Sequence, residues 1–174
     1  MKTFKASNYM RTPVATIGKG ATLKEAVRIM IEHKTNGLVV VDADNRVAGI
    51  LSSWDMIQHL VPDYLEEDQH LAAFEAAAKF KERVTELADD PIERFMTKQV
   101  HSIHPESTLM EAAATLSEFR IRQLPVVDDD GYLVGYLNRT DIKKAVAEIL
   151  GMTHNNRLWI HSLSPSLFSW RPTP

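Results

Sequence analysis

The chain repeats itself at a spacing of 86 residues, and this repeat constrains the fold more than any other feature. Met10 aligns with Met96, and residues 22–26 align with residues 108–112. A solenoid unit is shorter and occurs in three or more copies, because one such unit cannot bury its own apolar face. Two long copies therefore predict two similar subdomains packed about a pseudo-twofold axis. Such an axis creates paired clefts, and clefts are where ligands bind.

Each copy carries the same order of secondary-structure signals. Thr22 and Thr108 each precede a glutamate by three residues, which is the pattern of a helix capping box. Apolar residues follow at helical spacing, and a short β-branched run, an acidic turn and a return strand come next. The expected elements are helices from residues 23 and 109, strands at 38–41, 47–51, 124–127 and 133–137, and second helices at 56–60 and 142–150. Each copy is thus predicted to be strand, helix, strand, strand, helix, which makes an α+β fold.

Composition excludes several classes of protein. Across 174 residues, 44% are hydrophobic and 25% are charged, as in an ordinary globular protein. A net charge of −3 without an extended basic stripe gives no reason to expect a nucleic-acid surface. The absence of cysteine rules out disulfides, thiol catalysis and cysteine-based zinc sites. Because no apolar stretch suits secretion or a membrane span, we expect a cytoplasmic protein without membrane contact.

The strongest motif is a Gly-h-h-Ser/Thr-x-x-Asp segment, with h an apolar residue, that occurs once in each copy at residues 49–55 and 135–141. Together with the Leu-Pro-Val-Val-Asp run at 124–128, it resembles the CBS domain, named after cystathionine β-synthase. Two copies in register resemble a stand-alone CBS pair, with repeats at 6–60 and 92–150. The resemblance implies two β-α-β-β-α repeats and a regulatory module that binds AMP, ADP or ATP, or sometimes S-adenosylmethionine. It also implies a homodimer and an effector protein that the sequence does not identify.

The repeated aspartates are the first candidates for ligand contact. Asp55 and Asp141 stand near the start of a helix, where a carboxylate can accept two hydrogen bonds from a ribose diol. The alternative is that each aspartate only caps its helix. Three positions earlier, Ser52 can donate to phosphate oxygens, and Asn138 replaces that hydroxyl in the second copy. Backbone groups of the short strands suit an adenine edge, an isoleucine suits its face, and a histidine suits a phosphate. These remaining candidates are Ile17, Gly37, Leu38, Val39, Ile103, His104, Leu124 and Pro125.

The two clefts are not expected to be equivalent. Gly37 leaves room ahead of its strand in the first copy. The second copy carries Arg120, Arg122 and Arg139 near the same strand and loop ends, and arginine suits phosphate. Of these three, Arg122 is the one we assign to phosphate, whereas Arg120 has the alternative of a solvated surface charge. The second cleft is therefore predicted to be the more electropositive one.

Other chemistry has little support in the sequence. His101 and His104 form the one close histidine pair, but no carboxylate stands at ligand spacing, so we expect no metal site. No phosphate-binding glycine loop or nucleophile elbow is present. We therefore expect a binding protein with no required cofactor and no enzymatic activity.

Two segments lie outside the repeats. Residues 61–91 are predicted to be largely helical, with an apolar stripe that includes Leu71, Phe74 and Val84. This stripe either packs on its own module or forms a dimer contact. Residues 151–174 are rich in aromatic residues, serine and proline, and either fold back over the module or dock on a partner.

The sequence as a whole predicts a module that senses adenine nucleotides and passes the signal on by a conformational shift. The alternative is a structural or protein-interaction module that binds no nucleotide.

Overall fold

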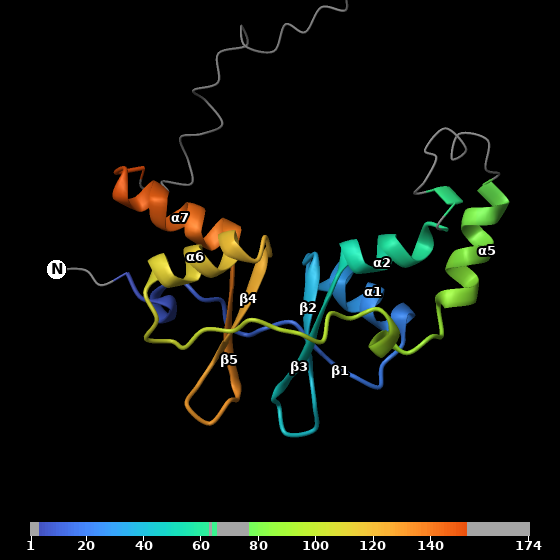
Figure 1. Ribbon diagram of the computed structural model, residues 1–174, viewed down its shortest axis with the longest axis horizontal. Helices are drawn as coiled ribbons and strands as arrows, with labels where there is room; N and C mark the ends of the chain where they lie inside the picture. The colour runs from blue at the N-terminus through green and yellow to red at the C-terminus, as the bar shows by residue number, and fades with distance from the viewer. Residues whose placement is uncertain (1–3, 63, 66–76, 153–174) are drawn as a thin grey trace, which may run out of the picture.

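The computed structural model describes residues 4–62, 64–65 and 77–152. The first repeat forms a three-stranded sheet in the order β1-β2-β3, in which β1 and β2 are parallel and β2 and β3 are antiparallel. Its elements are β1 (Thr16–Gly18), α1 (Leu23–Glu32), β2 (Gly37–Val41), β3 (Val47–Ser52) and α2 (Ser53–Leu60). This order is the predicted one, and the mixed α and β architecture with two repeats is confirmed (Figure 1).

The second repeat departs from the first at its opening strand. Its named elements are α6 (Leu109–Glu118), β4 (Gln123–Val127), β5 (Leu133–Asn138) and α7 (Arg139–Ile149), and β4 and β5 form a two-stranded antiparallel sheet. The expected first strand is reduced to a single parallel bridge between Ile103 and Val126. In the first repeat the ladder continues through the N–H of Lys19, which donates to the carbonyl of Val41. Pro105 occupies the equivalent position and has no N–H to donate, so the ladder stops.

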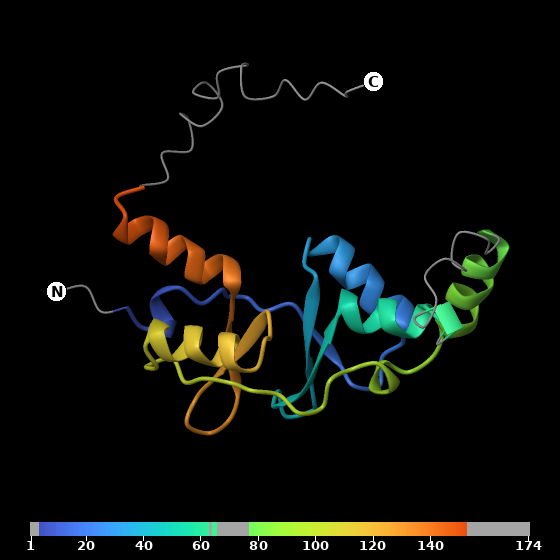
Figure 2. The same cartoon turned by 45° about the horizontal axis from the view of Figure 1, so that its top comes forward.

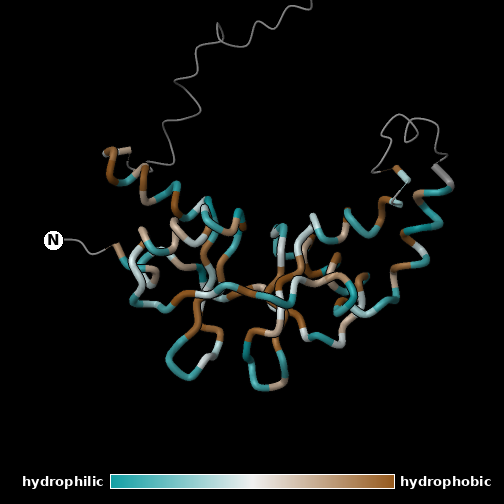
Figure 3. Tube along the Cα trace, viewed as in Figure 1, coloured by the Kyte–Doolittle hydropathy of each residue, from teal (hydrophilic) through white to brown (hydrophobic). Residues whose placement is uncertain are grey.

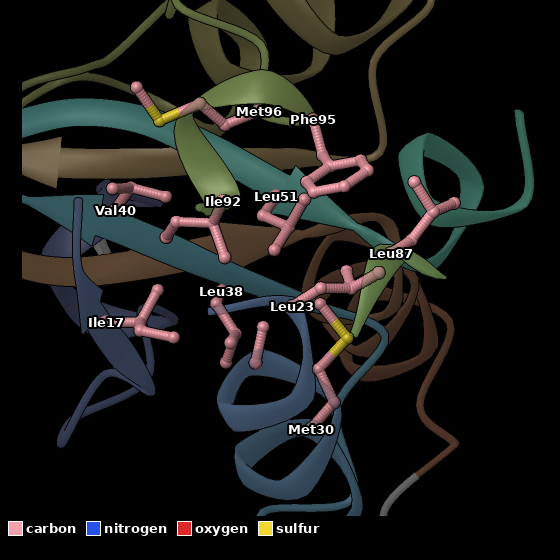
Figure 4. Packing of buried hydrophobic residues seen from close by; sticks show 11 residues of the cluster. Ile17, Leu23, Met30, Leu38, Val40, Leu51, Leu87, Ile92, Phe95 and Met96 are labelled. Carbon is pink, nitrogen blue, oxygen red and sulfur yellow. The ribbon is translucent and has the colours of Figure 1, made fainter. Parts of the chain in front are cut away.

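Each repeat is completed by the segment that precedes the other one. The 3-10 helix η2 (Ile92–Arg94) packs into the core of the first repeat, where Ile92 is fully buried with Leu38 and Leu51. Figure 4 shows Ile92, Phe95 and Met96 beside these leucines. The 3-10 helix η1 (Ala6–Asn8) correspondingly contributes the fully buried Ala6 to the core of the second repeat. The opening segments of the two repeats, at residues 6–8 and 92–96, are therefore exchanged, because each packs in the core of the other repeat.

The pseudo-twofold axis passes between the two sheets. Arg46 and Tyr132 are equivalent positions in the repeats, and they bridge to each other across the hairpin tips. The guanidinium carbon of Arg46 lies 4.8 Å from the centre of the Tyr132 ring. Figure 1 and Figure 2 show the helices of both repeats toward one end of the strands and the two hairpin turns at the opposite end. Hydrophobic residues are concentrated along the strands, whereas the hairpin tips are hydrophilic (Figure 3).

The insert is helical where the structure describes it. Helix α5 (Ala77–Leu87) lies beside α2, and the Arg83 Nη2 donates to the carbonyl oxygen of His59 at 3.0 Å. Leu87 is buried in the core of the first repeat, but Val84 is 40% exposed. Leu71 and Phe74 of the predicted apolar stripe lie outside the described residues, as does the predicted tail from residue 153 onward. Of the helices described, none is long and apolar enough to span a bilayer.

Candidate ligand-binding cavity

A cavity of about 790 Å³ lies between the two repeats, at the ends of the strands where the second helices begin. Its lining is arranged in equivalent pairs such as Val14 with Val100 and Ser52 with Asn138. The cavity therefore consists of two halves related by the pseudo-twofold axis. We call the part around the start of α2 the first half, and the part around the start of α7 the second half.

Both helix starts are held by a capping box. In the first half, Asp55 Oδ2 accepts from Ser52 N at 2.7 Å and from Ser52 Oγ at 2.5 Å, and Asp55 N donates back to Ser52 Oγ. In the second half, Asn138 Oδ1 accepts from Asp141 N at 3.2 Å, and Asn138 N donates to Asp141 Oδ2 at 3.1 Å. An amide oxygen accepts as a hydroxyl does, so the departure from the motif at Asn138 preserves the cap. Each aspartate caps its helix, and it does so through one of its two carboxylate oxygens.

The second carboxylate oxygen distinguishes the two aspartates. Asp141 is fully buried, and Arg11 Nε donates to its Oδ1 at 2.9 Å and to its Oδ2 at 3.0 Å. Lys144 Nζ lies 3.2 Å from Asp141 Oδ1. Asp55 is only half-buried and lines the cavity, and no cation of the described chain forms an ion pair with it. The Asp55 carboxylate therefore remains available as an acceptor in the first half.

The room expected beside Gly37 is already filled. The Gln123 side chain crosses the axis and lies so close to Gly37 that a β-carbon there would overlap its amide. The hydroxyl of Tyr136 donates to Gln123 Oε1, which fixes the amide in this place. Burial raises the pKa of Tyr136 to about 12. The nearby Arg11 guanidinium lowers this pKa, and the Asp141 carboxylate raises it. Gly37 thus serves close packing across the axis, and the prediction that it leaves space for a ligand is wrong.

The cavity is strongly basic in a chain of net charge −3. Its lining carries the cations Arg11, Lys34, Arg120, Arg122 and Arg139 against the single carboxylate of Asp55. Lys34 and Arg120 are equivalent, and each adopts a left-handed backbone conformation, with φ of 50° and 53°, between the first helix of its repeat and the following strand. Arg139 is partly held by the chain itself, because its Nε donates to the carbonyl oxygen of Ile121 at 3.2 Å. Such a concentration of guanidinium groups favours an anionic ligand.

The structure brings some of the predicted site residues together and separates others. The cavity is lined by Gly37, Ser52, Asp55, Arg122 and Asn138, and Asp141 lies directly behind Asn138. The others are absent from the lining: Ile17, Leu38, Ile103 and Leu124 are in the two cores, Val39 and Pro125 are fully buried, and His104 is outside the cavity.

The strand residues are displaced from the cavity for a simple reason. A strand buried on both faces directs its side chains alternately into the core and against the neighbouring layer, so neither set reaches the cavity at the strand ends. Ile17 and Ile103, expected to cover an adenine face, instead fill the two cores. The strand backbone is also largely used: Val39 N donates to Ala15 O, and the Pro125 carbonyl accepts from Ile103 N.

The two histidines of the sequence pair do not converge. His101 lines the cavity and stacks on Phe119 with 3.6 Å between ring centres. His104 Nε2 lies 3.3 Å from Asp129 Oδ1, away from the cavity. Among the described residues there is no cluster of three side chains able to hold a metal ion.

Three of the residues that shape the cavity were missed in the sequence. Arg11 and Gln123 contact Asp141 and Gly37, which are distant in the chain, and no motif marks them. Tyr136 stands at an apolar position of the second motif copy, which gives no sign of its hydrogen bond to Gln123. A position-by-position comparison of the repeats could have pointed to two of them, since Gln123 and Tyr136 replace Gly37 and Ile50 of the first copy. It does not, however, indicate that Arg11 reaches an aspartate 130 residues away.

The repeated motifs at the two helix starts agree with a comparison to protein families. The CBS domain model matches residues 6–62 and 92–148. The chain belongs to the CBS domain family.

Solved CBS pairs share the arrangement of both repeats. The CBS-pair protein CBSX2 from Arabidopsis thaliana superposes with a TM-score of 0.69 at 23% identity, covering 86% of this chain and 99% of that one. The CBS domain pair of protein MJ0100, in complex with 5′-methylthioadenosine and S-adenosyl-L-methionine, superposes with a TM-score of 0.66 at 25% identity, covering 85% and 99%.

Sequence relatives include larger proteins. A homoserine O-acetyltransferase of Methanohalobium evestigatum is 27% identical over 142 residues, which are 82% of this chain but only 24% of that enzyme. CBSX1, a chloroplastic CBS domain-containing protein of Arabidopsis thaliana, is 28% identical over 141 residues, or 74% of this chain and 57% of the relative. The chain thus spans about a quarter of the acetyltransferase and somewhat over half of CBSX1.

Proposed function

We propose that this CBS pair is a regulatory module that binds an adenosine-containing ligand, an adenine nucleotide (AMP, ADP or ATP), in the cavity between its repeats. The observation that carries the proposal is the Asp55 carboxylate, which is held in place through Oδ2 and lines the cavity with no cation of the described chain paired to it. A fixed carboxylate oxygen beside a helix start is a strong acceptor for ribose hydroxyls.

The ligands of related structures agree with this assignment. CBSX2 has been crystallised in complex with AMP, and the MJ0100 pair with 5′-methylthioadenosine and S-adenosyl-L-methionine. These molecules share an adenosine group and differ in what the 5′ position carries. The ribose and adenine are therefore the parts that the shared fold is suited to hold, and the local charge selects among the 5′ groups.

The cationic lining supports nucleotides over the positively charged S-adenosylmethionine. Arg122 is exposed, stands directly before β4 and lines the cavity, so its guanidinium is available to phosphate oxygens. Ser52 lies in the same lining, where its hydroxyl is engaged by the cap. Arg122 is accordingly the residue to which we assign phosphate binding.

Signalling follows from where the ligand sits. A nucleotide between the repeats contacts both, so it favours the relative orientation in which both sets of contacts form. Exposed apolar residues on the adjoining helices, such as Ile31 at 72% and Ile57 at 49% exposure, provide surfaces for a second copy of the chain or an effector protein. The same surfaces support the alternative function, a protein-interaction module that binds no nucleotide.

Calorimetric titration with AMP, ADP, ATP and S-adenosylmethionine separates the two functions. We expect a nucleotide to bind and Asp55→Ala to weaken it by about 1.5–3 kcal/mol, the range for hydrogen bonds to a charged group. Asp44→Ala is the matched control, because Asp44 is exposed in the β2–β3 hairpin and away from the cavity lining. Absence of heat with every nucleotide at millimolar concentration would leave the interaction module as the function.

Arg122→Ala tests the phosphate assignment separately. ATP should lose more affinity than adenosine, because only ATP carries phosphates for the guanidinium. Arg28→Ala is the control, since Arg28 is exposed on α1 and pairs with Glu32. An equal loss for both ligands would assign Arg122 to packing.

A further inference from the structure

We propose that Arg11 closes the second half of the cavity, so that each chain binds one nucleoside, in the first half. The inference rests on the proposed function, since it assigns the ribose site of the same cavity. It goes beyond the sequence prediction, in which the two repeated aspartates have the same role.

The second half has its carboxylate already in use. Arg11 donates one N–H to both oxygens of Asp141, Lys144 adds a contact at 3.2 Å, and the Asn138 N–H occupies Oδ2. The Asp141 side chain is 1% exposed, whereas that of Arg11 is 45% exposed and lines the cavity. Arg11 thus stands between the carboxylate and any ligand, in the place where a ribose diol would bind.

The first half has the same backbone without this side chain. Thr97 is equivalent to Arg11, and its N–H donates to Ile50 O at 2.9 Å just as the Arg11 N–H donates to Tyr136 O at 2.8 Å. The position equivalent to Lys144 is Gln58, so both cations that hold Asp141 are absent beside Asp55. With the backbone conserved, the difference between the halves depends on side chains alone.

A ligand cannot readily replace Arg11. A ribose hydroxyl is neutral, whereas the Arg11 guanidinium adds the attraction of opposite charges to its hydrogen bonds with the buried carboxylate. Displacing Arg11 would also leave its charge without its partner in a cavity that already holds four other cations. The second half is narrowed further because Tyr136 replaces the smaller Ile50 of the first half.

The stoichiometry of nucleotide binding tests the inference. Calorimetry with AMP on the full chain should give one ligand per chain, which Asp55→Asn weakens at least about tenfold and Asp141→Asn leaves unchanged. Arg11→Thr gives the second half the residue of the first and removes the side chain that lines the cavity in front of Asp141, so a second AMP should bind. Lys144 is not in the cavity lining and still compensates the charge of the buried carboxylate. Thr97→Arg makes the reverse exchange and should weaken the one existing site at least about tenfold. Melting curves of all four variants check that they are folded.

The possible failures point to different conclusions. Two AMP molecules on the parent chain, or one on Arg11→Thr with a normal melting curve, would overturn the role of Arg11 while the proposed function stands. Loss of binding in Asp141→Asn would overturn it in the same way. If neither the parent nor Arg11→Thr binds a nucleotide, the proposed function fails and the inference fails with it.

Discussion

The two repeats keep the same backbone but use it with different side chains. Capping boxes, strand register and the bridges of the exchanged segments recur at equivalent positions in both. The side chains break the symmetry where they meet the cavity: Asp55 faces it, whereas Asp141 is buried under Arg11. The repeat therefore provides a scaffold with two equivalent places, and a few side-chain differences make those places chemically unequal.

The cores differ in the same manner. Ile92 completes the first core and the smaller Ala6 holds the equivalent place in the second, yet both are fully buried. The second repeat also lacks the ladder hydrogen bond that Lys19 provides in the first, because of Pro105. The exchanged segments thus fit two pockets of different size.

The largest loss of stability is expected from Ile92→Ala, which gives the first core the alanine that the second core has at the equivalent position, Ala6. Ile92 is fully buried among Leu38, Leu51 and Phe95, so the change leaves a cavity and should cost about 2–5 kcal/mol of unfolding free energy. Urea denaturation measures this cost. Ile31→Ala is the control, because Ile31 is 72% exposed and should cost within about 0.5 kcal/mol. Similar values for the two variants would mean that the 92–96 segment does not belong to the first core.

A smaller loss of stability is expected at Gly37 and Gln123, which are equivalent positions and contact each other across the axis. Gly37→Ala places a β-carbon against the Gln123 amide and should cost about 1–3 kcal/mol, as overpacking does. Gln123→Ala removes the obstacle, so the double variant should be less destabilised than the sum of the two single ones. The coupling is read from a double-mutant cycle. Gly18→Ala is the matched control, since its β-carbon would meet open space. Additive costs would show that Gln123 moves away freely.

The smallest effect concerns Tyr136, which stands where the first repeat has Ile50. Burial raises its pKa to about 12, from about 10 for a tyrosine in an unfolded chain. The unfolded chain therefore releases this proton first, and the contribution of Tyr136 to stability is complete below pH 10 and is lost as the pH rises through about 12. Phenolate absorbance of the parent minus that of Tyr136→Phe should show this titration. A midpoint near pH 10 would show that the ring is solvated.

The sequence by itself determined the repeat, its elements and its family. Thr22 and Glu25 are three residues apart and can satisfy each other, so the start of α1 follows from local chemistry alone, and the same holds at Thr108. Asp55 and Asp141 likewise cap their helices as neighbours in the chain. Interactions of this kind require no knowledge of the rest of the fold.

Tertiary structure decided which parts meet across long distances in the chain. Strand alternation and burial direct Leu38 and Ile103 into the cores, although the sequence suggested that both contact a ligand. The exchange of the opening segments places Arg11 on Asp141 and Ile92 against Leu51, and no pattern along the chain encodes which of two equivalent repeats a segment joins. A repeat supplies two matching partners for every segment, so only packing in three dimensions selects between them.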